Sequence, residues 1–207
     1  MAFTQEQIDK LNIQFKGIPP AEIISWAVKQ AKRAVVTTNF RPYEVAILHA
    51  VVSVKHDIPV IWCDTGYNTP NTYKHAEELT TNLGLNIDLY VPKQTSAYRD
   101  ALLGIPQIND PRHAQFTDQV KLEPFRRAMV AHQPDVWFTN LRKGQTALRD
   151  SLNILNLGKD GVLKVSPFYH WNDVQLDAYL EERNLPNEHN YFDPTKVLEN
   201  RECGLHT

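Results

Sequence analysis

The residues best suited to chemistry in this chain lie at its C-terminus, in the run Arg201-Glu202-Cys203-Gly204-Leu205-His206-Thr207. Cys203 is one of two cysteines, and a position four residues from the end of a chain is an unusual place for a core thiol. Arg201 and a protonated His206 would favour the thiolate of Cys203, whereas Glu202 would oppose it. The run predicts a nucleophilic Cys203; the alternative is a tail that carries an incidental cysteine.

Composition limits the classes of protein to which the chain can belong. With 207 residues, 42% of them hydrophobic and 22% charged, it is typical of one globular α/β domain. A net charge of -2 provides no basic excess for binding nucleic acid. The N-terminus lacks the basic and then apolar pattern of a signal peptide, and no apolar run approaches the roughly 18 residues of a membrane span, so we expect a cytoplasmic protein.

The cysteine count also limits the cofactors. Two cysteines cannot supply the four thiolates of an iron–sulfur cluster or of a structural zinc site. We therefore expect no bound metal or cofactor, and any redox chemistry must be thiol chemistry.

Hydrophobic patterning predicts strands and helices in alternation. The expected strands are 34–38, 58–63, 86–91, 135–139 and a short strand within 161–168, and the expected later helices are 43–55, 69–83, 96–103, 121–132 and 171–183. Two earlier helices, one with a capping box at Thr4 and one opened by Pro19-Pro20, should pack on the sheet. This order implies a mostly parallel sheet with helices on both faces, in a single domain over 1–207 whose mobile C-terminal tail starts at about residue 186.

One stretch, 104–118, contains two prolines and no clear apolar periodicity. We interpret it as an ordered loop near the site or as a flap. Cys63 lies inside the apolar run of the second strand and is predicted to be a buried core residue.

Polar residues follow three of the predicted strands, at the edge of the sheet where open α/β sheets bind ligands. The turn Asn39-Phe40-Arg41-Pro42 leads into a helix, an arrangement that presents backbone N–H groups to an anion. Asp64-Thr65-Gly66-Tyr67 follows the second strand. Arg142, Lys143 and Arg149 follow the strand at 135–139 and predict a local anion site; the alternative is a solvated charged turn.

Four separated stretches resemble one family, the sulfonucleotide reductases. They are the Cys203 tail, Asp64-Thr65-Gly66-Tyr67 with the following Thr69-Pro70-Asn71-Thr72-Tyr73, the run Lys121-Leu122-Glu123-Pro124, and Leu141-Arg142-Lys143-Gly144-Gln145. Within this family the resemblance is closest to the thioredoxin-dependent phosphoadenosine phosphosulfate (PAPS) reductases. Phe116-Thr117 stand where a related branch has the cysteine pair of an iron–sulfur cluster, so the chain resembles the branch without a cluster.

The resemblance implies an adenine nucleotide α-hydrolase-like fold and a role for particular residues. The residues of the phosphate loop would be Thr37, Thr38, Asn39, Phe40 and Arg41. The strand end that borders the nucleotide would be Asp64, Thr65, Gly66 and Tyr67. The residues that hold the phosphates and the sulfate would be Lys121, Arg142, Gln145 and Arg149. Cys203 would be the nucleophile, and His206, three residues further along the same tail, would be the other catalytic residue. It would form an S-sulfocysteine that reduced thioredoxin, or glutaredoxin, resolves with release of sulfite. The family's common oligomer is a homodimer.

The chain departs from the family pattern in two places. Arg41-Pro42 replaces a glycine in the phosphate loop, and the stretch between Asn184 and Cys203 is short and lacks the usual segment rich in glycine, serine and threonine. The choice between PAPS and adenosine phosphosulfate (APS) therefore stays open. Two other hypotheses remain: a divergent phosphate-loop hydrolase or transferase, and a non-catalytic protein that binds an adenine nucleotide.

Overall fold

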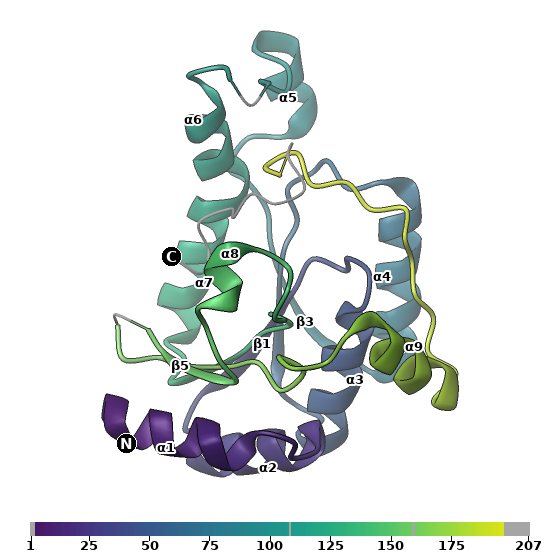
Figure 1. Ribbon diagram of the computed structural model, residues 1–207. Coiled ribbons are helices and arrows are strands. Elements are labelled where there is room, and N and C mark those ends of the chain that lie inside the picture. Colours follow the sequence, from purple (N-terminus) through teal and green to yellow (C-terminus); the bar gives the residue numbers. More distant parts are fainter. Residues whose placement is uncertain (1–2, 108, 159, 197–207) are drawn as a thin grey trace.

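A six-stranded sheet forms the centre of the protein. The computed structural model describes residues 3–107, 109–158 and 160–196 (Figure 1). The strand order is β3-β2-β1-β4-β6-β5, and each neighbouring pair is parallel except β5 with β6. The strands are β1 (Ala34–Thr38), β2 (Pro59–Cys63), β3 (Asn86–Tyr90), β4 (Val136–Phe138), β5 (Leu155–Leu157) and β6 (Leu163–Val165). The predicted mostly parallel sheet is confirmed.

The helices cover both faces and both ends of this sheet. They are α1 (Gln5–Phe15), α2 (Pro20–Gln30), α3 (Glu44–Val54), α4 (Pro70–Leu83), α5 (Ser96–Leu102), α6 (His113–Thr117), the π-helix η1 (Asp118–Leu122), α7 (Glu123–His132), α8 (Ala147–Asp150) and α9 (Asp173–Glu182). Figure 1 shows α5 and α6 at the opposite end of the molecule from α1 and α2. No helix among the described residues is long and apolar enough to cross a membrane.

Alternation along the strands divides the core into two layers. In β1, Val36 joins the larger cluster, which includes residues of α2, α3, α4 and α9, whereas the neighbouring Val35 joins a smaller cluster beneath α7. The same alternation places Val60 in the first layer and Ile61 in the second. Because successive side chains of a strand point to opposite faces, a nearly continuous apolar run is what a sheet covered on both sides requires.

Local signals in the sequence set several helix ends. Thr4 accepts a hydrogen bond from the Gln7 N–H while the Gln7 side chain accepts one from the Thr4 N–H, which completes the predicted capping box. Thr69 caps α4, and Gly84 ends it in the left-handed conformation with φ of 61°. Asn172 caps α9 with a second reciprocal pair, to Gln175. These helix boundaries were predictable from single residues.

The antiparallel strand β5 was not predicted. Its edge is covered by α1, where the buried Asn12 side chain both donates to the Leu155 carbonyl at 2.9 Å and accepts from the Leu155 N–H at 2.8 Å. The amide of Asn12 thus takes the place of a neighbouring strand. The prediction that the first two helices pack on the sheet is confirmed.

The prediction of a loop or flap over 104–118 is wrong from His113 onward. α6 begins at His113 and continues through η1 into α7. Its buried positions, His113, Phe116, Thr117, Val120 and Lys121, have helical spacing, but three of the five side chains are polar. A search for apolar periodicity alone therefore misses this helix.

Candidate functional site

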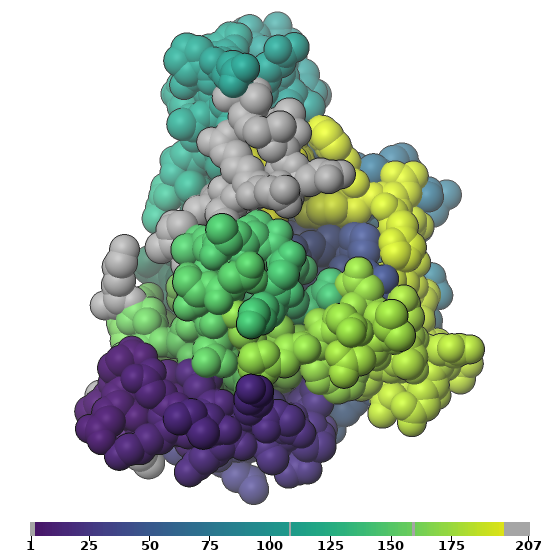
Figure 2. Space-filling view, viewed as in Figure 1, coloured from purple at the N-terminus to yellow at the C-terminus, as the bar shows by residue number. Residues whose placement is uncertain are grey.

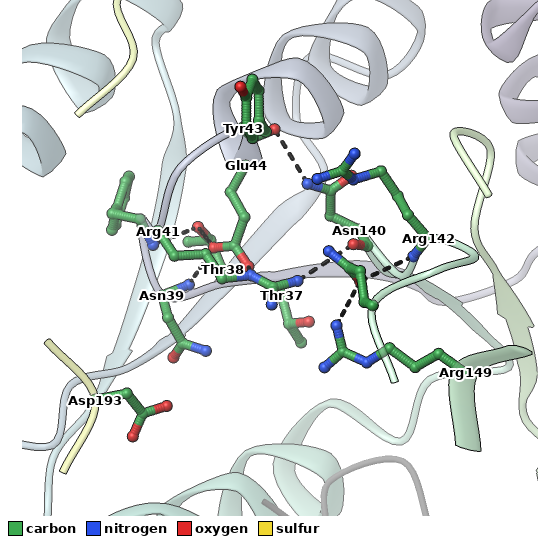
Figure 3. Close-up of polar contacts among 12 residues, drawn as sticks. Thr37, Thr38, Asn39, Arg41, Tyr43, Glu44, Asn140, Arg142, Arg149 and Asp193 are labelled. Carbon is green, nitrogen blue, oxygen red and sulfur yellow. Dashed lines mark hydrogen bonds and ion pairs between the residues drawn. The ribbon is translucent and has the colours of Figure 1, made fainter. Parts of the chain in front are cut away.

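A buried carboxylate organises the turn that follows β1. Glu44, in the first turn of α3 and 5% exposed, accepts hydrogen bonds from the Thr38 hydroxyl at 2.9 Å, the Asn39 N–H at 2.7 Å and Arg41 Nε at 2.7 Å (Figure 3). Phe40 takes a positive φ of 53°, and its side chain is buried against Trp62. Hydrogen bonds to Glu44 thus hold the predicted phosphate loop in its conformation, although the loop has no glycine.

The turn after β4 meets the turn after β1. Arg41 Nη2 donates to the Asn140 carbonyl at 3.2 Å, and Asn140 Nδ2 donates to the Tyr43 carbonyl at 3.1 Å. The Oδ1 atom of Asn140 is buried and has no hydrogen-bond partner among the described residues. Because β1 and β4 are adjacent parallel strands, their carboxyl ends bring these two turns together.

Gln145 connects the two arginines that follow β4. Its side-chain oxygen accepts hydrogen bonds from the Arg142 N–H at 3.1 Å and from Arg149 Nη1. Arg142 directs its guanidinium to Asp173 at 2.6 Å and lies 5.2 Å from the centre of the Tyr43 ring. Arg142 and Arg149 are buried, whereas Lys143 is exposed, so the reading of a solvated charged turn holds for Lys143 but not for the two arginines.

Lys121 forms a buried ion pair with the segment that follows α9. Its Nζ atom donates to Asp193 Oδ2 at 2.5 Å, with 2% of the lysine side chain and 6% of the aspartate side chain exposed. Burial raises the pKa of Asp193, but Lys121 and the hydrogen bonds from Thr195 lower it more, so the net shift is downward. This carboxylate is therefore ionised at neutral pH.

Many of these groups line one cavity, which is partly open to solvent. Its charged lining consists of four cations and two carboxylates: Arg41, Lys121, Arg149, Lys196, Glu44 and Asp193. Predicted site residues Thr37, Thr38 and Asn39 line it as well. Positive charge in a hollow at the carboxyl ends of parallel strands suits a phosphate- or sulfate-bearing ligand.

The turn after β2 is a separate polar unit outside this lining. Asp64 accepts hydrogen bonds from the Gly66 N–H at 2.9 Å and the Tyr73 hydroxyl at 3.0 Å. The Tyr67 hydroxyl donates to Asp100 at 2.7 Å, and Thr65 is buried. Burial of the Tyr73 hydroxyl raises its pKa to about 12, and the negative charge of the nearby Asp64 is the second cause. This turn holds α4 and α5 together and stays only a predicted border of the nucleotide.

Comparison with known proteins identifies the family. A sequence model of the phosphoadenosine phosphosulfate reductase domain matches residues 33–193. The chain belongs to the phosphoadenosine phosphosulfate reductase family. It is 30% identical to the phosphoadenosine 5'-phosphosulfate reductase of Xylella fastidiosa (strain M12), over 97% of this chain and 94% of that protein. It is 32% identical to the enzyme of Aliivibrio salmonicida (strain LFI1238), over 87% of this chain and 72% of that protein.

Solved structures agree with this assignment. A PAPS reductase from Candida auris, in a phosphate complex, superposes with a TM-score of 0.79 at 25% identity and 90% coverage of both chains. The FMN adenylyltransferase of Candida glabrata, in complex with ATP, reaches a TM-score of 0.57 at 10% identity, over 81% of this chain and 55% of that one. This second likeness shows the fold alone; the two superpositions together confirm the predicted adenine nucleotide α-hydrolase-like fold.

The site residues predicted from the resemblance to PAPS reductases fall into three groups according to their position relative to the cavity. Those that line the cavity are Thr37, Thr38, Asn39, Arg41, Lys121 and Arg149. Those that are not part of its lining are Phe40, Asp64, Thr65, Gly66, Tyr67, Arg142 and Gln145. Cys203 and His206 lie outside the described residues. The assignment of all these residues to substrate and catalysis stays a prediction.

Sequence reasoning missed several residues of the cavity. Glu44 had a signal, because an acidic residue three positions after Arg41 in the first turn of a helix can pair with it. Tyr191, Asp193 and Lys196 line the cavity from a segment that was read only as a link to the tail. Nothing local marks them, since the partner of Asp193 lies 72 residues earlier in the chain.

Cys63, the other thiol, also lines the cavity but is a poor nucleophile. Burial raises the pKa of its thiol to about 12, which the nearby Lys121 and Arg127 offset only in part. Its predicted place as a buried residue is confirmed. Since the thiolate is the reactive form and the raised pKa keeps Cys63 protonated, this thiol should react slowly in the folded protein.

We expect iodoacetamide, added to the folded protein at about pH 8, to leave Cys63 unmodified. Peptide mass spectrometry would locate the label, and the same treatment in denaturant serves as the control, in which Cys63 should be alkylated fully. Equal alkylation rates in the folded and the unfolded chain would show that the pKa of this thiol is not raised.

Proposed function

We propose that this chain reduces an adenylyl sulfate, PAPS or APS, to sulfite and the corresponding adenosine phosphate, with reduced thioredoxin or glutaredoxin as electron donor. The observation that carries the proposal is the cavity lined by Arg41, Lys121 and Arg149 at the carboxyl ends of β1 and β4, in a chain of the PAPS reductase family. We assign to it the phosphosulfate group of the substrate.

The charges of the cavity suit the difficult part of this reaction. The sulfur of a phosphosulfate is electrophilic, but anionic oxygens surround it and repel a thiolate. Cations that neutralise these oxygens lower the barrier to attack, and they act most strongly where water is excluded. Arg149 is 3% exposed and Lys121 is 1% exposed, so both would act from a low-dielectric environment.

Cys203 is the proposed nucleophile. Its thiolate would form a bond to the sulfonyl sulfur while the bond from that sulfur to the phosphate oxygen breaks, which releases the adenosine phosphate and leaves an S-sulfocysteine. A thiolate of the reductant would then attack Cys203 Sγ and expel sulfite, and the second thiol of the reductant would resolve the mixed disulfide. A dithiol reductant of this kind fits the reducing cytoplasm, where we place the protein.

The test is sulfite formation from PAPS, and separately from APS, by the purified full-length chain with thioredoxin, thioredoxin reductase and NADPH. We expect sulfite in proportion to NADPH consumed, and none when thioredoxin is left out. Release of pyrophosphate from ATP, without sulfite from either sulfonucleotide, would contradict the proposal and favour a phosphate-loop hydrolase or transferase.

A further inference from the structure

The carboxylate of Asp193 is held tightly on both of its oxygens. Oδ2 accepts from Lys121 Nζ, while Oδ1 accepts from the Thr195 N–H at 3.0 Å and from the Thr195 hydroxyl at 2.6 Å. Thr195 is 1% exposed, and its hydroxyl lies 3.4 Å from Lys121 Nζ. These contacts build a closed site around one anionic group.

The segment that carries Asp193 is anchored on the body of the protein. The Asn187 side-chain oxygen accepts from the Tyr43 N–H at 2.8 Å, and the Asn190 carbonyl accepts from the hydroxyls of Thr69 at 2.7 Å and Thr72 at 3.2 Å. Figures 1 and 2 show this yellow segment running beside α4. Asp193 therefore enters the cavity from the side opposite Arg149, carried by an ordered stretch of chain (Figure 3).

Lys121 lines the cavity, but its ammonium is already bound to an anion. Because 2% of its side chain is exposed and its Nζ atom already donates to Asp193 and Thr195, we expect an incoming oxyanion to compete with Asp193 for this lysine. A buried ammonium without a counter-ion is costly, so whichever anion leaves must be replaced by another. Either a carboxylate or a sulfonyl or phosphoryl oxygen can serve as the counter-ion of Lys121, since each accepts charge-assisted hydrogen bonds from lysine.

We propose that Asp193 is an internal anion that competes with the sulfonucleotide for Lys121, so that binding of the substrate exchanges the carboxylate for a substrate oxyanion. The inference rests on the proposed function, because it takes the ligand to be a sulfonucleotide. Asp193 then weakens substrate binding by the free energy of its own contact with Lys121. It also discriminates against ligands that bring no anion to this position, since they leave the ion pair intact.

The competition is measurable as a change of affinity. Binding of PAPS would be measured by calorimetry in a Cys203→Ser background, which prevents transfer of the sulfonyl group. We expect Asp193→Asn to bind PAPS at least about tenfold more tightly than its parent, because it removes the charge-assisted hydrogen bond that substrate must otherwise displace. In a Lys121→Met background the same substitution should change the affinity less than about twofold, since the lysine for which both anions compete is gone.

Matched controls separate this effect from others. Asp57→Asn makes the same change of net charge at a side chain that is 81% exposed and lies before the amino end of β2, outside the cavity lining, and it should leave PAPS binding unchanged. Adenosine, which carries no anion, should bind the parent and Asp193→Asn equally. Thr195→Val keeps every charge and removes the hydroxyl that holds Asp193, so it should also tighten PAPS binding, by a smaller factor of about twofold to fivefold.

Each outcome decides between the alternatives. Unchanged or weaker PAPS binding by Asp193→Asn would show that the pair with Lys121 is structural and would overturn the inference. If that variant does not fold, as judged by circular dichroism, Thr195→Val decides by the same criterion. PAPS binding by Lys121→Met with the same affinity as the parent would also overturn the inference. Absence of PAPS binding by the parent itself would overturn the proposed function and this inference with it.

Discussion

Cys203→Ser is expected to reduce sulfite formation by at least about 10³-fold while leaving the affinity for adenosine 3',5'-bisphosphate unchanged. A serine hydroxyl is not ionised at neutral pH, and no thiolate would remain to accept the sulfonyl group. The rate would be measured as sulfite released with reduced thioredoxin, and the affinity by calorimetry.

The matched control is Cys63→Ala, which removes the other thiol from the same chain. Cys63 lines the cavity, but because burial raises the pKa of its thiol to about 12, it should contribute no nucleophile. We expect this variant to retain sulfite formation within about tenfold of the wild type, a loss that packing changes alone can explain. If Cys203→Ser formed sulfite at the wild-type rate and Cys63→Ala formed none, the nucleophile would be Cys63 and not Cys203.

Glu44→Gln should cause the second large effect, on the stability of the protein. The carboxylate is buried and accepts hydrogen bonds from Thr38, Asn39 and Arg41, which no neutral amide can satisfy together because its NH₂ group would face donors. We expect the free energy of unfolding to fall by about 2–4 kcal/mol. Binding of PAPS should weaken as well, since the turn after β1 loses its support.

Urea unfolding would measure the loss, with Glu77→Gln as the control. Glu77 lies on the exposed face of α4, so the same chemical change there should alter the free energy of unfolding by less than about 0.5 kcal/mol. If Glu44→Gln were as stable as this control and bound PAPS equally well, Glu44 would not be the support of the phosphate loop.

The elements that could be predicted from sequence are those whose signals are local. The run Ala34–Thr38 is a strand with the expected bounds, and Thr4, Gly84 and Asn172 mark helix ends because each satisfies backbone groups within a few residues. α8, with four residues, is too short to show a period, and the edge of β5 is covered by Asn12, which lies 143 residues earlier in the chain.

The helix from His113 escaped prediction for a different reason. Its buried face carries a histidine, a threonine and Lys121, so its pattern of burial is helical while its pattern of hydropathy is not. Burial of these polar side chains depends on partners supplied by the rest of the fold, such as Asp193 for Lys121. A sequence window around His113 contains none of this information.

In the candidate site, too, some residues have a signal in the sequence and others depend on distant partners. Arg41 and Arg149 could be named in advance because they are cations that follow predicted strands, and Lys121 because the run that it opens resembles the family pattern. Their counter-charges could not, since Asp193 reaches Lys121 only through the path of the chain after α9. The charge balance of the cavity, and with it the affinity for an anion, is therefore a property of the tertiary structure.

The central claim is that Cys203 takes a sulfonyl group from an adenylyl sulfate bound in the cationic cavity. Its most direct test is mass spectrometry of the intact protein, and then of its peptides, after mixing with PAPS in the absence of any reductant. We predict a gain of one SO₃ group per chain, located on the peptide that contains Cys203 and removed by reduced thioredoxin with release of sulfite. An unmodified chain, or an adduct on Cys63 instead, would contradict the claim.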